Sequence, residues 1–239
     1  GHSASASLNL AYRDPLKAFF SRLEVGYQCN YSPLSSSRRF VGDYILNSYL
    51  NHDNRSRNWS INGRISKGVD WLGTILTLNS NYSKTTASIY QNDVETNYSC
   101  TIWNINPKLT MSPAYWCNFS YELNYNRTWL MMKNTSVETN LSNLSQTTTV
   151  AITPSKIWYL KLKCEHYYNE ITNDVKKTLV LADADFTYCF KGGWELNLAV
   201  TNIFDQHNYA YRSYSGTTSL YQSYKIRPRN VVASVYFRF

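Results

Sequence analysis

The 239-residue sequence is poor in the residues that interrupt β-strands, with nine glycines and six prolines. Charged residues make up only 17% of it, and no stretch reaches the roughly 18 consecutive apolar residues of a membrane-spanning helix. The five cysteines are odd in number and widely spaced, which signals neither a disulfide framework nor a zinc site. These shortages argue against a helical membrane protein and against a small disulfide-rich or zinc-bound fold.

Aromatic and uncharged polar residues fill the place of the missing types. Tyrosine alone occurs 21 times, and aromatic residues reach 15%. Such a composition favours strands and argues against disorder. The net charge is +8, but the basic residues are scattered, and no basic stripe interleaved with aromatic residues predicts a nucleic-acid partner.

Apolar and polar residues alternate along most of the chain, as in "VVASVYFRF" at residues 231–239. Period-two alternation held for ten or more residues predicts strands that are longer than the usual 5–6 residues and long enough to cross a membrane at a tilt. Eleven strands are expected, at residues 5–12, 19–32, 57–67, 72–84, 97–111, 114–127, 141–153, 157–169, 178–190, 194–204 and 229–239.

The connections between these segments alternate in length. Short ones are expected at 13–19, 66–71, 111–116, 153–158 and 190–194, and longer ones near 33–56, 84–96, 127–140 and 205–227. The segment 43–50 is assigned to a hairpin within the first long connection, because counting it as a crossing strand would break the alternation. The predicted fold class is all-β: an antiparallel, up-and-down portion of a transmembrane β-barrel, with about eleven long strands, short periplasmic turns and long extracellular loops.

Several motifs carry a resemblance to a known family. "NLAVTNIFDQHNY" (197–209) and "SYKIRPRNVVASVYFRF" (223–239) resemble the end of TonB-dependent outer-membrane receptors, particularly those of Bacteroidota, and "YRDPLKAFF", "GDYILNSYL" and "ISKGVDWL" are similar to the middle of the same barrels. The resemblance implies a nutrient transporter of the bacterial outer membrane, with siderophores, vitamins, oligosaccharides or peptides as substrate classes. Its implied partners are outer-membrane lipid, TonB, the barrel-assembly machinery and, as an open question, a surface lipoprotein.

The chain departs from the family pattern in two ways. The family has 22 strands and an N-terminal plug, whereas residues 1–239 show about half the strands and no plug. We therefore expect these residues to be the C-terminal part of one barrel domain, completed by the remaining strands and the plug, through which TonB would act. The alternatives are a smaller outer-membrane pore or adhesin completed by another chain, and a soluble β-sandwich binding module.

Three groups of candidate residues follow from the alternation and the resemblance. The assembly signal is assigned to Val231, Val235, Phe237 and Phe239. The lumen- and plug-facing set comprises Arg22, Glu24, Arg64, Glu122, Lys161, Lys163, Asp183, Asp185 and Glu195. The substrate-loop candidates are Tyr209, Tyr211, Arg212, Tyr214 and Tyr221, because a tyrosine ring with a polar tip suits sugars, peptides or chelates.

No constellation of residues predicts an enzyme, a cofactor or a metal centre. Asp183 and Asp185 share a strand face and are interpreted as part of a wet lumen rather than as paired acids or metal ligands. His166 precedes Glu170 by four residues, a metal-binding spacing on a helix, but the surrounding pattern is that of a strand. A barrel lipase would use a serine and a histidine, but no nucleophile motif such as G-x-S-x-G accompanies the histidines, so the sequence does not favour that activity.

Overall fold

A computed structural model describes residues 1–41, 44–133, 137–172, 174–215 and 217–237. The protein is almost entirely β-structure, and its one helical element within these residues is a single 3₁₀ turn, η1 (Trp71–Gly73). No helix of the described part is long and apolar enough to cross a membrane. The all-β prediction is therefore confirmed.

Eleven antiparallel strands form the continuous path of the main sheet, in the order β1-β2-β5-β6-β7-β8-β9-β10-β11-β12-β15, and a short hairpin within residues 33–56 joins the same sheet off this path. Each strand pairs with the next one along this path, so the sheet is an up-and-down meander, as predicted. The strands are β1 (His2–Asp14), β2 (Phe19–Ser32), β5 (Asn54–Val69), β6 (Thr74–Gln91), β7 (Val94–Ala114), β8 (Cys117–Met132), β9 (Val137–Ile152), β10 (Trp158–Glu170), β11 (Lys176–Cys189), β12 (Trp194–Thr201) and β15 (Asn230–Phe237).

Two of the expected long loops are strand instead. β6 and β7 continue through residues 84–96 and meet at Asn92 and Asp93, whose φ angles of 50° and 64° form a two-residue hairpin turn. Likewise β8 runs on to Met132, and β9 begins at Val137. The β6–β7 extension is largely polar on both faces and the end of β8 is apolar on both, so neither shows a period-two alternation, while their Thr, Ile, Val, Tyr and Trp residues favour extended backbone.

The other two long connections contain hairpins of their own. β3 (Ser35–Val41) and β4 (Tyr44–Leu50) pair within residues 33–56, which places the 44–50 segment outside the crossing strands as predicted. β13 (Asn208–Ser215) and β14 (Thr218–Lys225) form a separate two-stranded sheet within residues 205–227. The second hairpin is expected as a loop, because polar and aromatic residues occur on both sides of its strands and leave no period-two alternation.

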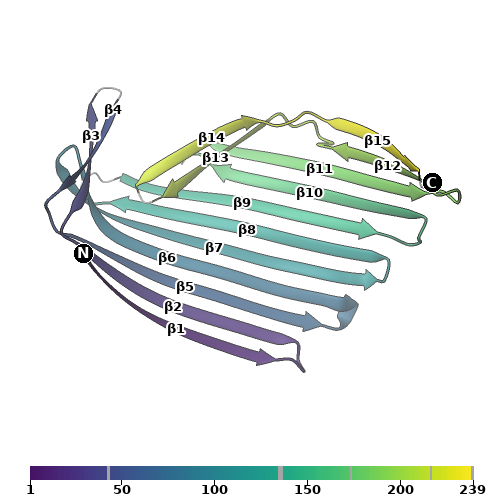
Figure 1. Ribbon diagram of the computed structural model, residues 1–239, viewed down its shortest axis with the longest axis horizontal. Helices are drawn as coiled ribbons and strands as arrows, with labels where there is room; N and C mark the ends of the chain where they lie inside the picture. Colours follow the sequence, from purple (N-terminus) through teal and green to yellow (C-terminus); the bar gives the residue numbers. More distant parts are fainter. Residues whose placement is uncertain (42–43, 134–136, 173, 216, 238–239) are drawn as a thin grey trace.

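The main sheet is open and curved, with β1 and β15 at opposite edges (Figure 1). Within the described residues β1 pairs only with β2, and β15 only with β12. The hairpins β3–β4 and β13–β14 lie toward the same end of the strands, which we call the long-loop end; the opposite end, with the turns before β2, β8 and β12, is the short-turn end.

Few apolar side chains are buried in this sheet. The buried ones lie toward the long-loop end and are Cys100, Leu130, Leu141, Ile171, Leu179 and Ala210. Leu179 and Ala210 lie where the β13–β14 hairpin approaches β10 and β11. The rest of the sheet leaves both of its faces accessible, so the fold has no central dry core among the described residues.

Candidate functional site

The pairing register sorts the side chains of the main sheet onto two faces. Directly paired residues of antiparallel strands point to the same side, so a chain of pairs carries one face across the sheet. One such chain joins Arg22 to Arg64 and Arg64 to Asn79. We call this side the polar face and the opposite side, which carries Leu23 and Ile65, the apolar face.

The nine residues predicted to face a lumen or plug all project from the polar face. The register links Arg22 and Glu24 on β2 to Arg64 and Asn62 on β5, and continues across the sheet to Glu195 on β12. That they line a lumen stays a prediction. The set on this face is Arg22, Glu24, Arg64, Glu122, Lys161, Lys163, Asp183, Asp185 and Glu195.

Ion pairs on the polar face are exposed and balanced in sign. Lys163 Nζ lies 3.0 Å from Glu165, and Lys108 Nζ lies 3.7 Å from Glu122. Arg22 contacts Glu24 at 3.3 Å, with both side chains at least 40% exposed. Pairs of this kind each contribute about 0–1 kcal/mol to the free energy of unfolding. These charges therefore favour hydration of the polar face and add little to stability.

The apolar face is uncovered. Its side chains remain accessible, with exposed fractions of 48% for Ile65, 37% for Leu198 and 65% for Val231. The predicted assembly residues Val231, Val235 and Phe237 all lie on this face, paired with Val200, Leu196 and Trp194 of β12. Phe239 lies outside the described residues.

The seven tryptophans of the chain lie in two groups, one toward each end of the strands, and the five on strands all project from the apolar face. Toward the long-loop end, Trp59, Trp103 and Trp129 project from the apolar face of β5, β7 and β8. At the short-turn end, η1 and the turn before β8 hold Trp71 and Trp116, and β10 and β12 begin with Trp158 and Trp194. We call these groups the two tryptophan belts.

The distance between the belts matches a bilayer. Trp59 and Trp71 are separated by 12 residues, and Trp116 lies 13 residues from both Trp103 and Trp129. At about 3.3 Å per residue this is roughly 40 Å along the strand, or roughly 30 Å perpendicular to a membrane for a strand tilted by about 40°. Hydrocarbon cores are about 30 Å thick.

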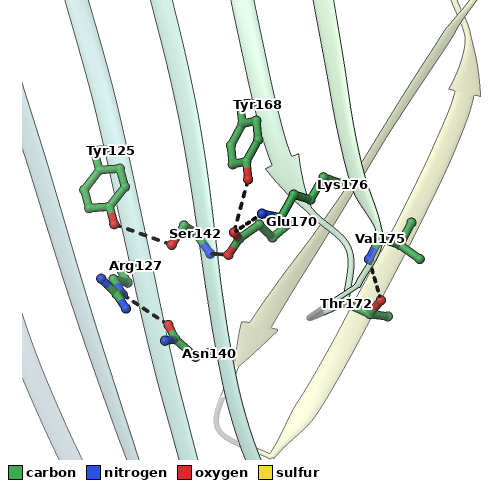
Figure 2. Close-up of polar contacts among 9 residues, drawn as sticks. All are labelled: Tyr125, Arg127, Asn140, Ser142, Tyr168, Glu170, Thr172, Val175 and Lys176. Atoms are coloured by element: carbon green, nitrogen blue, oxygen red, sulfur yellow. Dashed lines mark hydrogen bonds and ion pairs between the residues drawn. The ribbon is translucent and has the colours of Figure 1, made fainter.

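A polar network marks the long-loop border of the apolar face on β8–β11 (Figure 2). Glu170 accepts hydrogen bonds from the Ser142 backbone N–H (2.8 Å) and the Tyr168 hydroxyl (3.2 Å), and its carboxylate lies 4.0 Å from Lys176 Nζ. Arg127, directly paired with Ser142, donates to Asn140. Polar and charged side chains thus gather at the long-loop border of the apolar face on these strands.

The β13–β14 hairpin carries all the substrate-loop candidates, and it folds against the polar face. Tyr209 stacks on Tyr224 at 5.8 Å between ring centroids, and its edge meets Tyr167 of β10 at 5.3 Å. On the hairpin's other side, the Arg212 guanidinium lies 5.9 Å from the Tyr221 ring. The candidates Tyr209, Tyr211, Arg212, Tyr214 and Tyr221 are therefore close together, but Arg212 and Tyr221 do not share a side with Tyr209 and Tyr211.

Hydrogen bonding within the hairpin perturbs one tyrosine. The hydroxyls of Tyr211 and Tyr224 both donate to Gln222 Oε1. The pKa of Tyr224 is raised to about 12, mainly by hydrogen bonding to Tyr211 and to a smaller extent by desolvation. The Tyr224 phenol is therefore a neutral hydrogen-bonding group over the physiological pH range.

Asn202 anchors the hairpin to the main sheet. Its backbone N–H donates to Asp183 Oδ1 (2.8 Å), and its side-chain amide donates to the carbonyls of Gln206 (2.8 Å) and Arg227 (2.9 Å). Its Oδ1 in turn accepts from the Gln206 N–H at 2.9 Å. This residue fixes both ends of the segment that contains β13 and β14, and sequence reasoning did not single it out.

The described residues offer no metal centre, since no group of three or more His, Cys, Asp or Glu side chains comes together among them. His166 and Glu170 lie on strand β10, where a four-residue spacing separates them along the strand instead of bringing them together on a helix turn. In the strand register Asp183 lies opposite Lys163, and Asp185 opposite Lys161; that they belong to a wet lumen stays a prediction.

Sequence reasoning also missed the asparagines of the polar face. Its candidates there were charged residues, and uncharged side chains gave no comparable signal. Only the register reveals that Asn126, Asn143 and Asn169 are aligned on neighbouring strands.

Comparisons with protein-family models, with curated proteins and with solved structures found no match.

Proposed function

We propose that this chain forms part of the barrel wall of a TonB-dependent nutrient transporter in a bacterial outer membrane. In this proposal the apolar face contacts lipid, and the polar face lines the lumen and contacts the plug. The long-loop end faces the cell exterior, and the short turns face the periplasm. Two observations support this proposal. The C-terminal motifs, such as "VTNIFD" at 200–205, resemble those of this family, and the main sheet has one polar and one apolar face.

One observation carries the membrane part of this proposal: a bare apolar face bounded by two tryptophan belts. Exposing such a face to water costs about 25 cal/mol of free energy per Å² of apolar surface, whereas contact with lipid hydrocarbon avoids this cost. Tryptophan is enriched at both interfaces of a bilayer. A soluble β-sandwich would instead bury this face against a second sheet, and Leu198 and Val231 remain accessible here.

The free edges of β1 and β15 support the part of the proposal that concerns further strands. A bilayer requires every backbone hydrogen-bonding group to find a partner within the protein. Strands outside this chain's sheet would pair with β1 and β15 and close the barrel, and a plug would fill the lumen and transmit the action of TonB. The barrel-assembly machinery would read the apolar end of β15, at Val235 and Phe237.

Two native cysteines test the assigned faces. Cys164 lies mid-strand on the apolar face, paired with Ala182, and Cys189 lies on the polar face, paired with Glu195. In outer-membrane vesicles, variants that each keep one of these cysteines are treated with a water-soluble and a lipid-soluble maleimide. We expect the water-soluble reagent to label Cys189 and spare Cys164, and the lipid-soluble one to label Cys164. Equal labelling of both positions by the water-soluble reagent, or absence of the protein from the outer membrane, would contradict the proposal.

A further inference from the structure

A row of asparagines crosses the polar face perpendicular to the strands. Successive directly paired positions on nine strands, from β1 to β11 along the main sheet, hold asparagine seven times. Glu24 on β2 and Lys177 on β11 complete the row. The asparagine row consists of Asn9, Asn62, Asn81, Asn104, Asn126, Asn143 and Asn169.

A second line of uncharged polar side chains runs next to it, two residues along each strand. Asn79, Asn106 and Asn124 are aligned on β6, β7 and β8, with Ser145 and Tyr167 following on β9 and β10. The amides contact one another: Asn79 donates to Asn106 (3.2 Å), and Asn106 donates to Asn124. On β7–β10 the two lines therefore present a patch of neutral donors and acceptors with no charged side chain in it.

The β13–β14 hairpin covers one end of this patch. Asn143 Nδ2 donates to the Arg212 carbonyl (3.2 Å), and Asn169 Nδ2 donates to the Ala210 carbonyl (3.1 Å). Between the hairpin and the sheet lies a hollow of about 210 Å³. Its lining consists of Asn124, Asn126, Asn143, Leu144, Ser145, Tyr167, Asn169, Tyr209 and Tyr211.

The chemistry of this lining selects a class of ligand. None of the lining residues is charged, so the lining itself offers no cation to a carboxylate or a phosphate. The Glu165 carboxylate next to it is already engaged by the Tyr167 hydroxyl (3.1 Å) and by Lys163 (3.0 Å). Each asparagine amide supplies two donors and one acceptor, which suits hydroxyl groups that both donate and accept. Tyr209 adds an aromatic surface on which the apolar face of a sugar ring can pack, and the Oδ1 atom of Asn143 has no hydrogen-bond partner among the described residues.

We propose that this hollow binds one ring of a neutral oligosaccharide, and that the neighbouring members of the asparagine row on β7 and β6, Asn104 and Asn81, extend the contact to further rings along the wall. This inference rests on the proposed function, in which the polar face lines the path of a nutrient. The hollow is below the lower limit of about 300 Å³ typical of sites for whole drug-sized molecules, which fits one ring of a longer ligand. The uncharged lining distinguishes this ligand from an anionic chelate and from a peptide with charged ends.

The test uses the full-length protein, purified from outer membranes in detergent, and isothermal titration calorimetry. The probes are maltohexaose, cellohexaose, laminarihexaose, xylohexaose and mannohexaose, with hexagalacturonate and a hexaglycine peptide as charged counterparts. We expect at least one neutral hexasaccharide to bind, and both Asn126→Leu and Tyr209→Ala to weaken that binding about tenfold or more. Asn9→Leu changes the far end of the same row, on β1 and six strands from β9, outside the proposed contact; it is the matched control and should leave affinity unchanged.

Tyr209→Phe keeps the ring and should retain binding within about threefold, which separates ring packing from a general loss of structure. Heat-modifiable migration on gels verifies that each variant is folded. The inference is overturned if no neutral hexasaccharide binds, if a charged probe binds instead, or if Asn9→Leu weakens binding as much as Asn126→Leu. These results leave the transporter proposal standing whenever the same preparation comes from the outer membrane, whereas absence from that membrane defeats the transporter proposal itself.

Discussion

Trp194 and Phe237 face each other across β12 and β15, with ring centroids 4.4 Å apart and ring planes at 67°. This edge-to-face contact lies at the short-turn end of the last strand, within one of the tryptophan belts. It is the sole ring–ring contact between β12 and β15 among the described residues. The pair therefore holds the end of β15 in register with β12.

Phe237→Ala should loosen the last strand. Aromatic pairs of this geometry contribute about 0.5–1.5 kcal/mol beyond the area they bury, so we expect hydrogen-exchange protection of the β15 amides to fall by about 1 kcal/mol. Tyr236→Ala is the matched control, because Tyr236 pairs with Glu195 on the polar face and has no ring partner among the described contacts. Equal loss of protection in both variants would contradict a specific role for the Trp194 contact.

Leu198→Arg should be far more damaging than Asn197→Arg. Leu198 lies at mid-strand on the apolar face of β12, between Phe186 and Ala233, whereas Asn197 points to the polar face and donates to Thr187. An arginine at the lipid midplane of a barrel costs about 2–4 kcal/mol, and one facing the lumen costs little. Urea unfolding of the protein in lipid vesicles measures the difference. Similar losses at the two positions would refute the assigned faces.

Asn202→Ala should release the β13–β14 hairpin from the sheet. Four hydrogen bonds converge on this buried residue, whose φ of 53° also disfavours alanine. Leaving buried groups unpaired costs about 1–3 kcal/mol, so protection of the β13 and β14 amides should fall by that amount in hydrogen-exchange mass spectrometry. Asn197→Ala, which removes one hydrogen bond on the neighbouring strand, should leave the hairpin unchanged.

The hairpin should also lose stability at high pH. The pKa of Tyr224 is about 12 in the folded hairpin, above the value of about 10 for an unfolded chain. The stabilisation of the folded hairpin by the neutral Tyr224 hydroxyl is therefore fully present below pH 10 and is lost as the pH rises from about 10 to 12. Nuclear magnetic resonance of ¹³Cζ-labelled tyrosine, assigned with Tyr224→Phe, follows this titration. Tyr211→Phe should lower the pKa of Tyr224, and a wild-type titration near pH 10 would contradict the assigned hydrogen bond.

The alternation of residues was sufficient to predict the main sheet. The eleven expected strands correspond to the eleven strands of the sheet, and the 43–50 segment was placed outside them through residues Tyr44–Leu50. Period two is readable wherever one face is apolar and the other polar, as around Leu196 and Leu198. Where both faces are polar, as in the extension of β6 and β7 toward Asn92, the pattern disappears and the strands were taken for a loop.

The candidate site was harder to predict, because it depends on register. The period-two alternation along one strand predicts that Lys161 and Lys163 share a side, but it does not say which residues of the next strand lie beside them. Register is set by turn geometry and strand offset, and a shift of one residue would have divided the asparagine row between two faces. The fold of residues 205–227 back onto Asn143 and Asn169 is a tertiary contact with no local sequence signal.

The unpaired margins of β1 and β15 constrain when this sheet can enter a bilayer. Along the 13 residues of β1, every second residue turns its N–H and C=O away from β2. Each such group would lose several kcal/mol in hydrocarbon. Under the proposed function, insertion therefore requires both edges to pair with neighbouring strands first, and a sheet kept in water with free edges would instead pair with copies of itself.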